Sequence, residues 1–255
     1  MIRALKVLQI PTMNQNLHDQ LAPTGVLRVA LNMSNFLLVN SETESGAPDG
    51  VSPAIARAIG EKLGVEVELI PFKGPGEVAD AATGDVWDIA NIAAEPERAK
   101  TIDFSPAYCE IQATYLLPPG SELKSVAEVD AEGRRIAAKG RAAFELWLSD
   151  NLKHATVVQA CSHETAFDAF VEQKLDALAG LRPKLIEQQA ALPGSLLLEE
   201  SFTSVKQSIG CKPGNIDASS FLKSFVRDSV KNGLVQSLID KYGVTGRLSV
   251  ASVRD

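Results

Sequence analysis

The chain has 255 residues, of which 45% are hydrophobic and 22% charged, and its formal net charge is −7 at pH 7. These values are ordinary for a globular protein that is long enough for one large or two small domains. The acidic balance argues against nucleic acid or an anionic membrane surface as the main partner, because both bind basic faces. No apolar run reaches the ~18 residues that a membrane span needs.

The cysteines and histidines follow no spacing that indicates a disulfide framework or a metal site. We therefore expect free thiols, no metal and no cofactor. The residues concerned are Cys109, Cys161, Cys211, His18, His154 and His163.

The N-terminal segment MIRALKVLQIPTMNQNLHDQL has only a short apolar patch, which Lys6, Gln9 and Pro11 interrupt. It is too weak for a secretory signal, and no small-residue cleavage site follows it. We expect a periplasmic protein if a leader has been removed, and a cytoplasmic one if Met1 is the native start.

In the first part of the chain, β-rich runs alternate with helical patterns. Strict alternation of apolar and polar residues predicts a strand at 65–72, and Gly64 is placed to end the helix before it. The predicted elements are a strand at 26–31, a helix at 53–64, a strand at 65–72, a helix at 77–84 and a strand at 87–93. This order favours parallel strands with helices on the faces of the sheet.

The same alternation restarts beyond residue 110 without any fixed-period repeat. The predicted elements are a strand and a Pro-Pro-Gly turn within 113–123, strands at 134–138, 155–160 and 176–180, and helices at 142–152, 162–175 and 183–192. A strand and a turn within 204–215 and two helices within 221–243, separated near Gly233, complete the chain.

The C-terminal helices have no partner strands of their own, so we expect them to pack on the first unit. The first lobe would then be discontinuous, comprising residues 25–110 and 207–255, with a second lobe at 114–203 and an N-terminal extension at 1–24. The two crossings, near 110–114 and 202–207, would form a hinge, and the cleft between the lobes would be the binding site.

Seven segments between Gly25 and Gly243 resemble, in order and spacing, the family 3 extracellular solute-binding proteins, which are the polar amino-acid receptors of ABC importers. The segments are TGVLRVALN, GVSPAIARAIGEKLGVEVELIPF, GDVWDIA, EPERAKTIDFSPAY, GRRIAAKGRAAFE, KLDALAG and SIGCKPGN. The resemblance implies an α/β, type II periplasmic-binding-protein fold, in which two lobes joined by two hinge crossovers close on a ligand. It also implies a monomer, with a membrane permease as its partner if the protein is exported.

Arg98 follows the strand at 87–93 in a polar turn with Glu95, Glu97 and Lys100. The residues alone would favour a solvated turn arginine. In the family that Arg98's segment resembles, the matching arginine holds the ligand's carboxylate, which the rigid fork of a guanidinium fits bidentately. The resemblance therefore implies that Arg98 is the carboxylate ligand.

Four further residues fall where the family lines its pocket. Ala93 removes a hydroxyl from its position, and the amide of Asn91 could either meet the ligand or satisfy backbone groups at the strand end. Asn35 and Phe36 lie in the loop after the first strand, where family receptors often place an aromatic ring against the ligand. For Phe36 the alternative is an ordinary core residue.

The segment containing Lys139, Arg141 and Ala142 occupies the family's Gly-Thr-Thr turn at a helix start. Unpaired backbone N–H groups at such a turn bind anions well. Arg141 replaces a hydroxyl residue and adds a cation, unless its side chain projects into solvent.

Leu181 takes the place of the Asp that pairs with the α-ammonium group in many family receptors, and Arg182 follows it. A buried ammonium without a counter-charge costs several kcal/mol. We therefore hypothesise a ligand that carries a carboxylate but makes no α-ammonium contact. The cations Arg98, Arg141 and Arg182 would suit an organic acid or another anionic metabolite.

Three functions remain open at this point. The first is a receptor of an ABC-type importer that closes, without chemistry, on a small carboxylate ligand, either amino-acid-like or an organic acid. The second is an enzyme similar to the cyclohexadienyl dehydratases, which resemble these receptors; it would need a protonated carboxyl in the cleft, with Glu110 and Glu145 as candidates. The third is a cytoplasmic solute-binding or sensor protein without a transporter.

Overall fold

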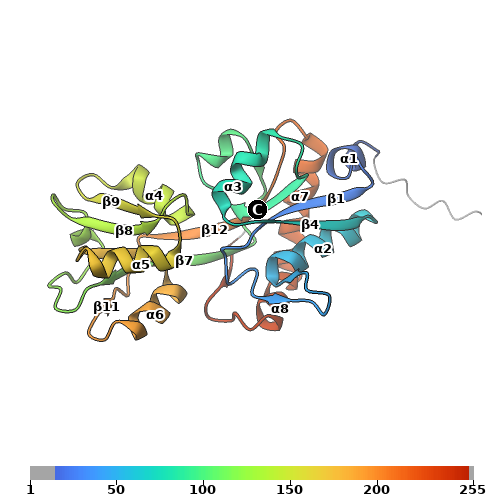
Figure 1. Ribbon diagram of the computed structural model, residues 1–255. Helices are drawn as coiled ribbons and strands as arrows, with labels where there is room; N and C mark the ends of the chain where they lie inside the picture. Colours follow the sequence, from blue (N-terminus) through green and yellow to red (C-terminus); the bar gives the residue numbers. More distant parts are fainter. Residues whose placement is uncertain (1–14, 253–255) are drawn as a thin grey trace, which may run out of the picture.

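The computed structural model describes residues 15–252, and Figure 1 shows them as two groups of α/β elements. Two long strands, β7 (Cys109–Leu117) and β12 (Thr203–Cys211), connect the groups. We call the group that contains β1 the first lobe and the group that contains β8 the second lobe.

The first lobe is built on a short parallel sheet. In it, β1 (Val26–Asn32) pairs in parallel with β4 (Glu66–Phe72) on one side and β5 (Ile89–Ala93) on the other. Its other elements are α2 (Val51–Leu63), α3 (Pro75–Asp80), the 3₁₀ turns at Ala81–Thr83 and Arg98–Lys100, and the two-residue strands β2 (Ser41–Glu42), β3 (Pro48–Asp49) and β6 (Asp103–Phe104).

The end of α2 shows how the sequence fixes an element in this lobe. Gly64 has φ 71° and closes the helix with backbone bonds to Gly60 and Glu61. A left-handed backbone conformation at this position favours glycine, because a residue without a Cβ atom adopts it without steric penalty. The predicted helix end is therefore confirmed.

The second lobe repeats the pattern. There β8 (Arg135–Lys139) lies between β9 (Thr156–Ala160) and β10 (Ala177–Leu181), parallel to both, while β7 pairs antiparallel with β10. Its remaining elements are α4 (Ala143–Asn151), α5 (His163–Glu172), α6 (Arg182–Ala191), β11 (Leu196–Leu197) and a 3₁₀ turn at Ala127–Val129.

The strands β7 and β12 run antiparallel between the lobes, with Cys109 opposite Gln207 and Ala113 opposite Thr203. They join the strands of the two lobes into one sheet, whose order is β4-β1-β5-β12-β7-β10-β8-β9. The predicted crossings near 110–114 and 202–207 fall in or beside these strands. The residue bounds predicted for the lobes remain a prediction.

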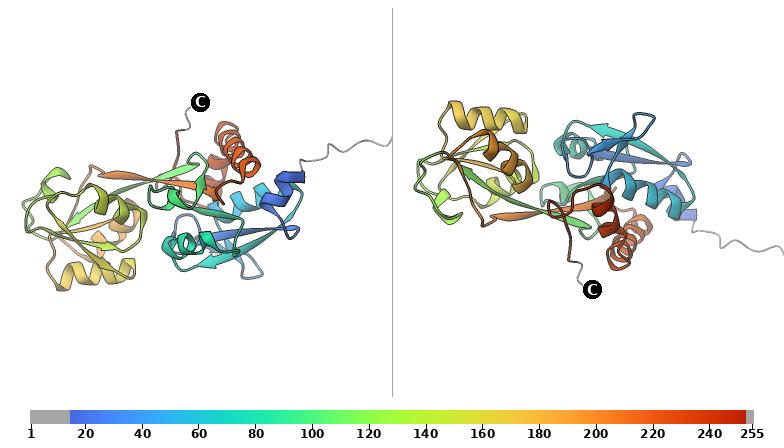
Figure 2. Two further views of the ribbon diagram at one scale, coloured as in Figure 1. Left: turned by 90° about the horizontal axis from the view of Figure 1, so that it is seen from above. Right: turned by 90° about the horizontal axis from the view of Figure 1, so that it is seen from below.

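The C-terminal helices α7 (Ile216–Lys231) and α8 (Leu234–Lys241) pack against the first lobe, as both views in Figure 2 show. The last strand, β13 (Ser249–Val250), pairs with β7. The predicted N-terminal extension is only partly described: its first 14 residues lie outside the described residues, and α1 (Gln15–Leu21) packs on α7.

Several predicted boundaries were wrong. The strand β7 begins at Cys109 instead of 113, because pairing with distant β12 extends it. The helix α7 begins at Ile216 instead of 221, directly after the turn at Asn215. The two-residue strands were missed because two residues carry no periodic signal.

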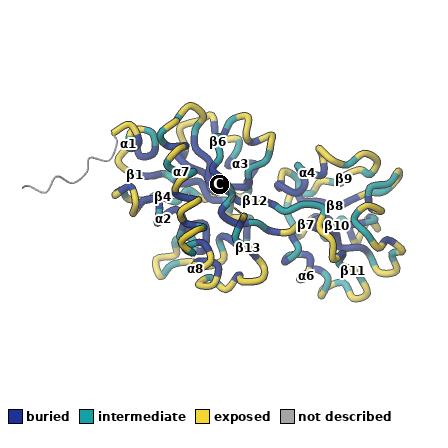
Figure 3. Tube along the Cα trace, turned by 180° about the vertical axis from the view of Figure 1, so that it is seen from behind, coloured by how far each residue is buried: buried dark blue, intermediate teal, exposed yellow. Residues whose placement is uncertain are grey.

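Buried side chains fill the space between the sheet and its helices in each lobe, and Figure 3 shows the central strands as the buried part of the chain. The largest cluster continues through β7 and β12 from one lobe to the other. Among residues 15–252, no helix is long and apolar enough to cross a membrane.

Candidate functional site

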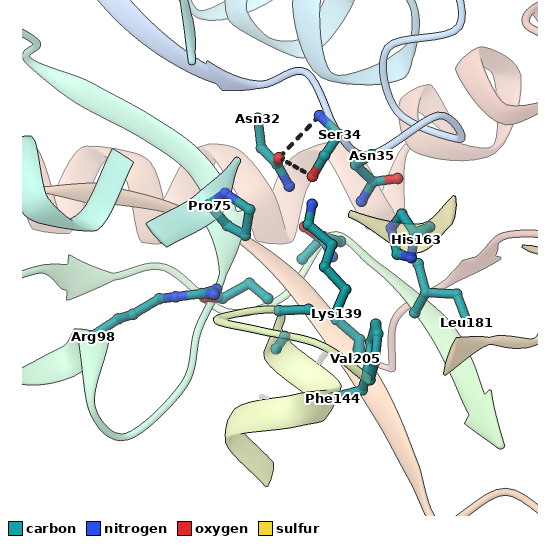
Figure 4. A pocket seen from close by; sticks show the side chains of 14 residues that line it. Asn32, Ser34, Asn35, Pro75, Arg98, Lys139, Phe144, His163, Leu181 and Val205 are labelled. Carbon is teal, nitrogen blue, oxygen red and sulfur yellow. Dashed lines mark hydrogen bonds between the residues drawn. The ribbon is translucent and has the colours of Figure 1, made fainter. Parts of the chain in front are cut away.

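A pocket lies where the two lobes face each other, and Figure 4 shows the side chains around it. We call it the inner pocket; its volume is about 30 Å³, room for one or two water molecules. Among residues 15–252, no Asp or Glu lines it. The lining residues are Asn32, Ser34, Asn35, Pro75, Ala93, Arg98, Lys139, Ala142, Ala143, Phe144, His163, Leu181, Val205 and Gln207.

A larger cavity of about 520 Å³ adjoins it, and we call this the outer pocket. The two pockets share Ser34, Pro75, Lys139 and His163. A volume of this size is in the range of small-molecule sites. A ligand larger than a few waters would therefore occupy the outer pocket as well, or displace side chains between the two.

Arg98 lies at the start of the 3₁₀ turn that follows β5, and only 4% of its surface is exposed. Its guanidinium donates to the carbonyl oxygens of Ala93 (2.9 Å) and Arg141 (3.1 Å). Within residues 15–252 no carboxylate forms an ion pair with it. Three of its five N–H groups therefore donate no hydrogen bond within the described residues.

Burial lowers the pKa of the Arg98 guanidinium to about 10, although the charge of Glu95 opposes this shift. Burial also raises the pKa of Glu95 to about 7, against the attraction of Arg98. Near neutral pH, Arg98 is thus a charged group beside an acid that is only partly ionised. The structure places Arg98 in the pocket and not on the solvated surface that its neighbours alone suggested.

Several other predicted residues also line the inner pocket. Asn35 and Ala93 come from the first lobe, and Lys139, Ala142 and Leu181 from the second. Leu181 ends β10, and its apolar side chain is buried at the position predicted to lack a carboxylate.

Phe36 lines the outer pocket instead. The ammonium of Lys184 lies 5.9 Å from its ring centre and the guanidinium of Arg247 lies 5.7 Å from it. An electron-rich ring face attracts cations, so Phe36 helps to place positive charge at the mouth of the cleft.

Asn91, Arg141 and Arg182 have other contacts. The Asn91 amide donates to the carbonyl of Ser52 (3.0 Å) and lines neither pocket, which fits its backbone-satisfying alternative.

Arg141 borders the outer pocket, but its guanidinium pairs with Asp80 at 2.6 Å. Arg182 donates to the carbonyl of Leu198 (3.1 Å) and to Gln112 (2.8 Å), away from both pockets. Neither guanidinium is therefore free to bind a ligand in this arrangement.

Eight lining residues of the inner pocket were not predicted as site residues: Asn32, Ser34, Pro75, Ala143, Phe144, His163, Val205 and Gln207. The imidazole of His163 stacks on Phe144 at 6.2 Å between ring centres. Burial and the charge of Lys139 lower the pKa of His163 to about 4, so the ring is neutral at pH 7. The sequence signal that could have placed His163 near the pocket is its position at the first residue of α5, directly after the capping Ser162.

The candidate acids of the enzyme alternative lie outside the inner pocket. Glu110 is on β7 and accepts a hydrogen bond from Ser204 (3.1 Å). Glu145 is buried in α4, where it accepts from the Arg141 backbone (2.8 Å), Ser149 (2.8 Å) and Gln159 (2.7 Å). These hydrogen bonds tie Glu145 to the turn at Arg141, to α4 and to β9.

The sequence matches the family model of the bacterial extracellular solute-binding proteins, family 3, over residues 27–245. The chain belongs to this family. A search of curated proteins gave no match.

Solved structures of solute-binding proteins are similar over most of the chain. One is the cysteine-binding protein from Campylobacter jejuni, with a TM-score of 0.72 and 16% identity over 95% of this chain and 97% of that one. Another is a putative binding component of an ABC transporter from Wolinella succinogenes, complexed with lysine, with a TM-score of 0.71 and 19% identity over 86% and 96%.

A third structure is an ancestral amino acid-binding protein described as a precursor of cyclohexadienyl dehydratase. Its TM-score is 0.69, with 21% identity over 88% of this chain and 98% of that one. At these identities the likeness shows the fold alone. The predicted type II periplasmic-binding-protein fold is confirmed, and this solute-binding protein presents its pocket where the two lobes meet.

Proposed function

We propose that the protein is the receptor of an ABC-type importer that closes on a small carboxylate and makes no contact with an α-ammonium group. The observation that carries the proposal is Arg98, a buried cation at the inner pocket with no carboxylate partner among the described residues. On this proposal the receptor is a monomer, and it delivers the ligand to a membrane permease.

The lining of the inner pocket supports the missing ammonium contact. No Asp or Glu lines it, and Leu181 occupies the position where many family receptors carry an Asp. Burying an ammonium without a counter-charge costs on the order of several kcal/mol. Amino acids should therefore bind more weakly than acids of the same carbon skeleton.

Arg98 variants test the proposal by equilibrium binding to a panel of organic acids. Arg98→Gln removes the charge, and Arg98→Lys keeps the charge but loses the fork. We expect the affinity to fall at least about 30-fold in the Gln variant and less in the Lys variant, because truncating one partner of a buried charged pair costs about 2–5 kcal/mol.

Arg134→Gln is a matched control, since Arg134 pairs with Asp176 in the second lobe and lines neither pocket. It should bind as the unchanged protein does. The proposal would be contradicted if the Arg98→Gln variant bound every acid as tightly as the unchanged protein does.

A dehydratase-like activity is the second candidate, because one similar structure is described as a dehydratase precursor. Neither Glu110 nor Glu145 lines the inner pocket, so we expect no turnover of prephenate or arogenate. Formation of an aromatic product, lost on Glu110→Gln or Glu145→Gln, would favour the enzyme instead.

A further inference from the structure

Lys139 is the second cation of the inner pocket. It is the last residue of β8, and only 7% of its surface is exposed. Among residues 15–252, its ammonium forms no hydrogen bond or ion pair. A lysine is rarely buried in this way unless it is paired.

The surroundings of Lys139 do not supply the missing partner. His163 beside it is neutral near pH 7, and Gly74 across the cleft has no side chain. Glu77 and Glu164 line only the outer pocket and act on Lys139 from a distance. The pKa of Lys139 is lowered because burial outweighs the attraction of these two carboxylates.

Arg98 and Lys139 thus share one pocket while belonging to opposite lobes. Figure 4 shows the two side chains entering the pocket from different sides. With no acidic side chain in the lining, two buried cations without ion-pair partners face the same space. Unpaired charges in a low dielectric are strongly unfavourable, so such a pair calls for negative charge from the ligand.

We infer that the ligand carries a second anionic group, which binds Lys139 while the first carboxylate binds Arg98. This inference rests on the proposed function and narrows the substrate class to short dicarboxylates or similar dianions. A ligand of this kind would tie the lobes together, because each of its ends is held by a different lobe.

The outer pocket fits the same ligand class. It is lined by four cationic and two acidic side chains, but Arg141 and Lys184 are paired with Asp80 and Glu164. Lys73 and Lys139 then stand against Glu77 alone, which leaves a small excess of positive charge. On a protein whose formal net charge is −7, this local excess favours the entry of an anion. Since Lys139 borders both pockets, a dianion could extend from Arg98 toward the outer one.

The test is isothermal titration calorimetry at pH 7 with malonate, succinate, glutarate and adipate. Each is compared with the monocarboxylate of equal carbon number. For the best dicarboxylate, we expect an affinity at least roughly 30-fold higher than that of its monocarboxylate. This ratio corresponds to the lower end of the free-energy range for losing one partner of a buried charge pair.

Lys139→Met should remove the preference, because it should lower the affinity for the dicarboxylate far more than that for the monocarboxylate. Lys139→Arg should retain the preference for two charges. The control Lys62→Met removes a lysine that pairs with Asp228 at 3.7 Å in the first lobe and lines neither pocket, and it should leave the preference unchanged.

The Lys139→Met protein should be at least as thermally stable as the unchanged protein, so a loss of binding cannot be a loss of fold. Equal affinities for the two acids, or equal losses for both on Lys139→Met, would overturn the second anionic site while leaving Arg98 as a carboxylate site. Binding of amino acids and of no acid would overturn the proposed function as well.

Discussion

At the scale of single residues, the site depends on which charges have partners. Arg98 and Lys139 are buried without carboxylate partners among the described residues, whereas Arg141 and Arg182 are held by Asp80 and by backbone carbonyls. All four are cations that sequence reasoning assigned to ligand binding. Only the first two line the inner pocket.

Glu95 makes carboxylate binding sensitive to pH. Its pKa is raised to about 7, so it is mostly neutral at pH 6 and mostly ionised at pH 8. Glu95 forms no ion pair with Arg98 among the described residues, but the charge of its ionised form offsets part of the positive charge of Arg98, so the affinity for an anion should fall severalfold over this range. His163, with a pKa of about 4, stays neutral throughout. Calorimetry at pH 6 and pH 8 measures the effect, and Glu95→Gln should abolish it.

The same shift affects folding in a defined direction. The folded-state pKa of Glu95 lies above the unfolded value of 4.5, so the folded protein holds this proton more tightly. Its contribution to stability is present below pH 4.5 and is lost as pH rises to about 7. A thermal melt in which Glu95→Gln gains stability relative to the unchanged protein only at acidic pH would contradict this assignment.

Leu181 determines whether an ammonium is tolerated. In Leu181→Asp we expect affinity for organic acids to fall at least about tenfold, equivalent to about 1.4 kcal/mol, by charge repulsion. Amino acids should gain relative to the acids. The neutral control Leu181→Asn separates charge from shape, and a calorimetric profile unchanged between Asp and Asn would contradict the account.

At the scale of elements, two surface ion pairs link the lobes. Arg141, in the turn before α4, pairs with Asp80 at the end of α3 at 2.6 Å. Arg247, in the segment that packs on the first lobe, pairs with Glu187 of α6 at 3.0 Å. Both pairs join elements of opposite lobes, so they stabilise the arrangement in which the lobes approach.

Asp80→Ala should therefore weaken ligand binding without touching the ligand. Since exposed pairs are worth about 0.2–1 kcal/mol, the loss should be at most about fivefold and should come from faster dissociation. The control Asp228→Ala removes a similarly exposed partner of Lys62 within the first lobe. Stopped-flow dissociation rates that respond equally to both variants would refute a role for the inter-lobe pair.

The sequence predicted most helices and strands because their periodicity is local. The strand at 65–72 and the helix ending at Gly64 could be read from a dozen residues, and both are present within one or two residues. The start of β7 could not be read in this way, because it depends on pairing with β12 about 95 residues later.

The site was predictable to the extent that the family resemblance placed residues in it. Arg98, Lys139 and Leu181 were expected there and line the inner pocket. Gln207 was missed because a polar residue inside β12 looks like any strand residue until the lobes are placed. Arg182 was misplaced because its guanidinium lies against Leu198, on a loop that no local pattern positions.

At the scale of the whole molecule, one sheet runs through both lobes, and the pocket lies where β7 and β12 cross between them. Residues far apart in sequence, such as Asn35 and Leu181, meet there because each lobe ends its strands toward the same cleft. This arrangement lets each lobe contact a different end of a ligand.

The central claim is that the receptor recognises a carboxylate and not an amino acid. Calorimetry with matched pairs tests it most directly: succinate against aspartate, and glutarate against glutamate, which differ only in the α-ammonium group. The account predicts that for at least one pair the acid binds at least about tenfold more tightly than its amino acid, since an ammonium in this pocket would lack a counter-charge. Tight binding of aspartate or glutamate with no binding of either acid would contradict it.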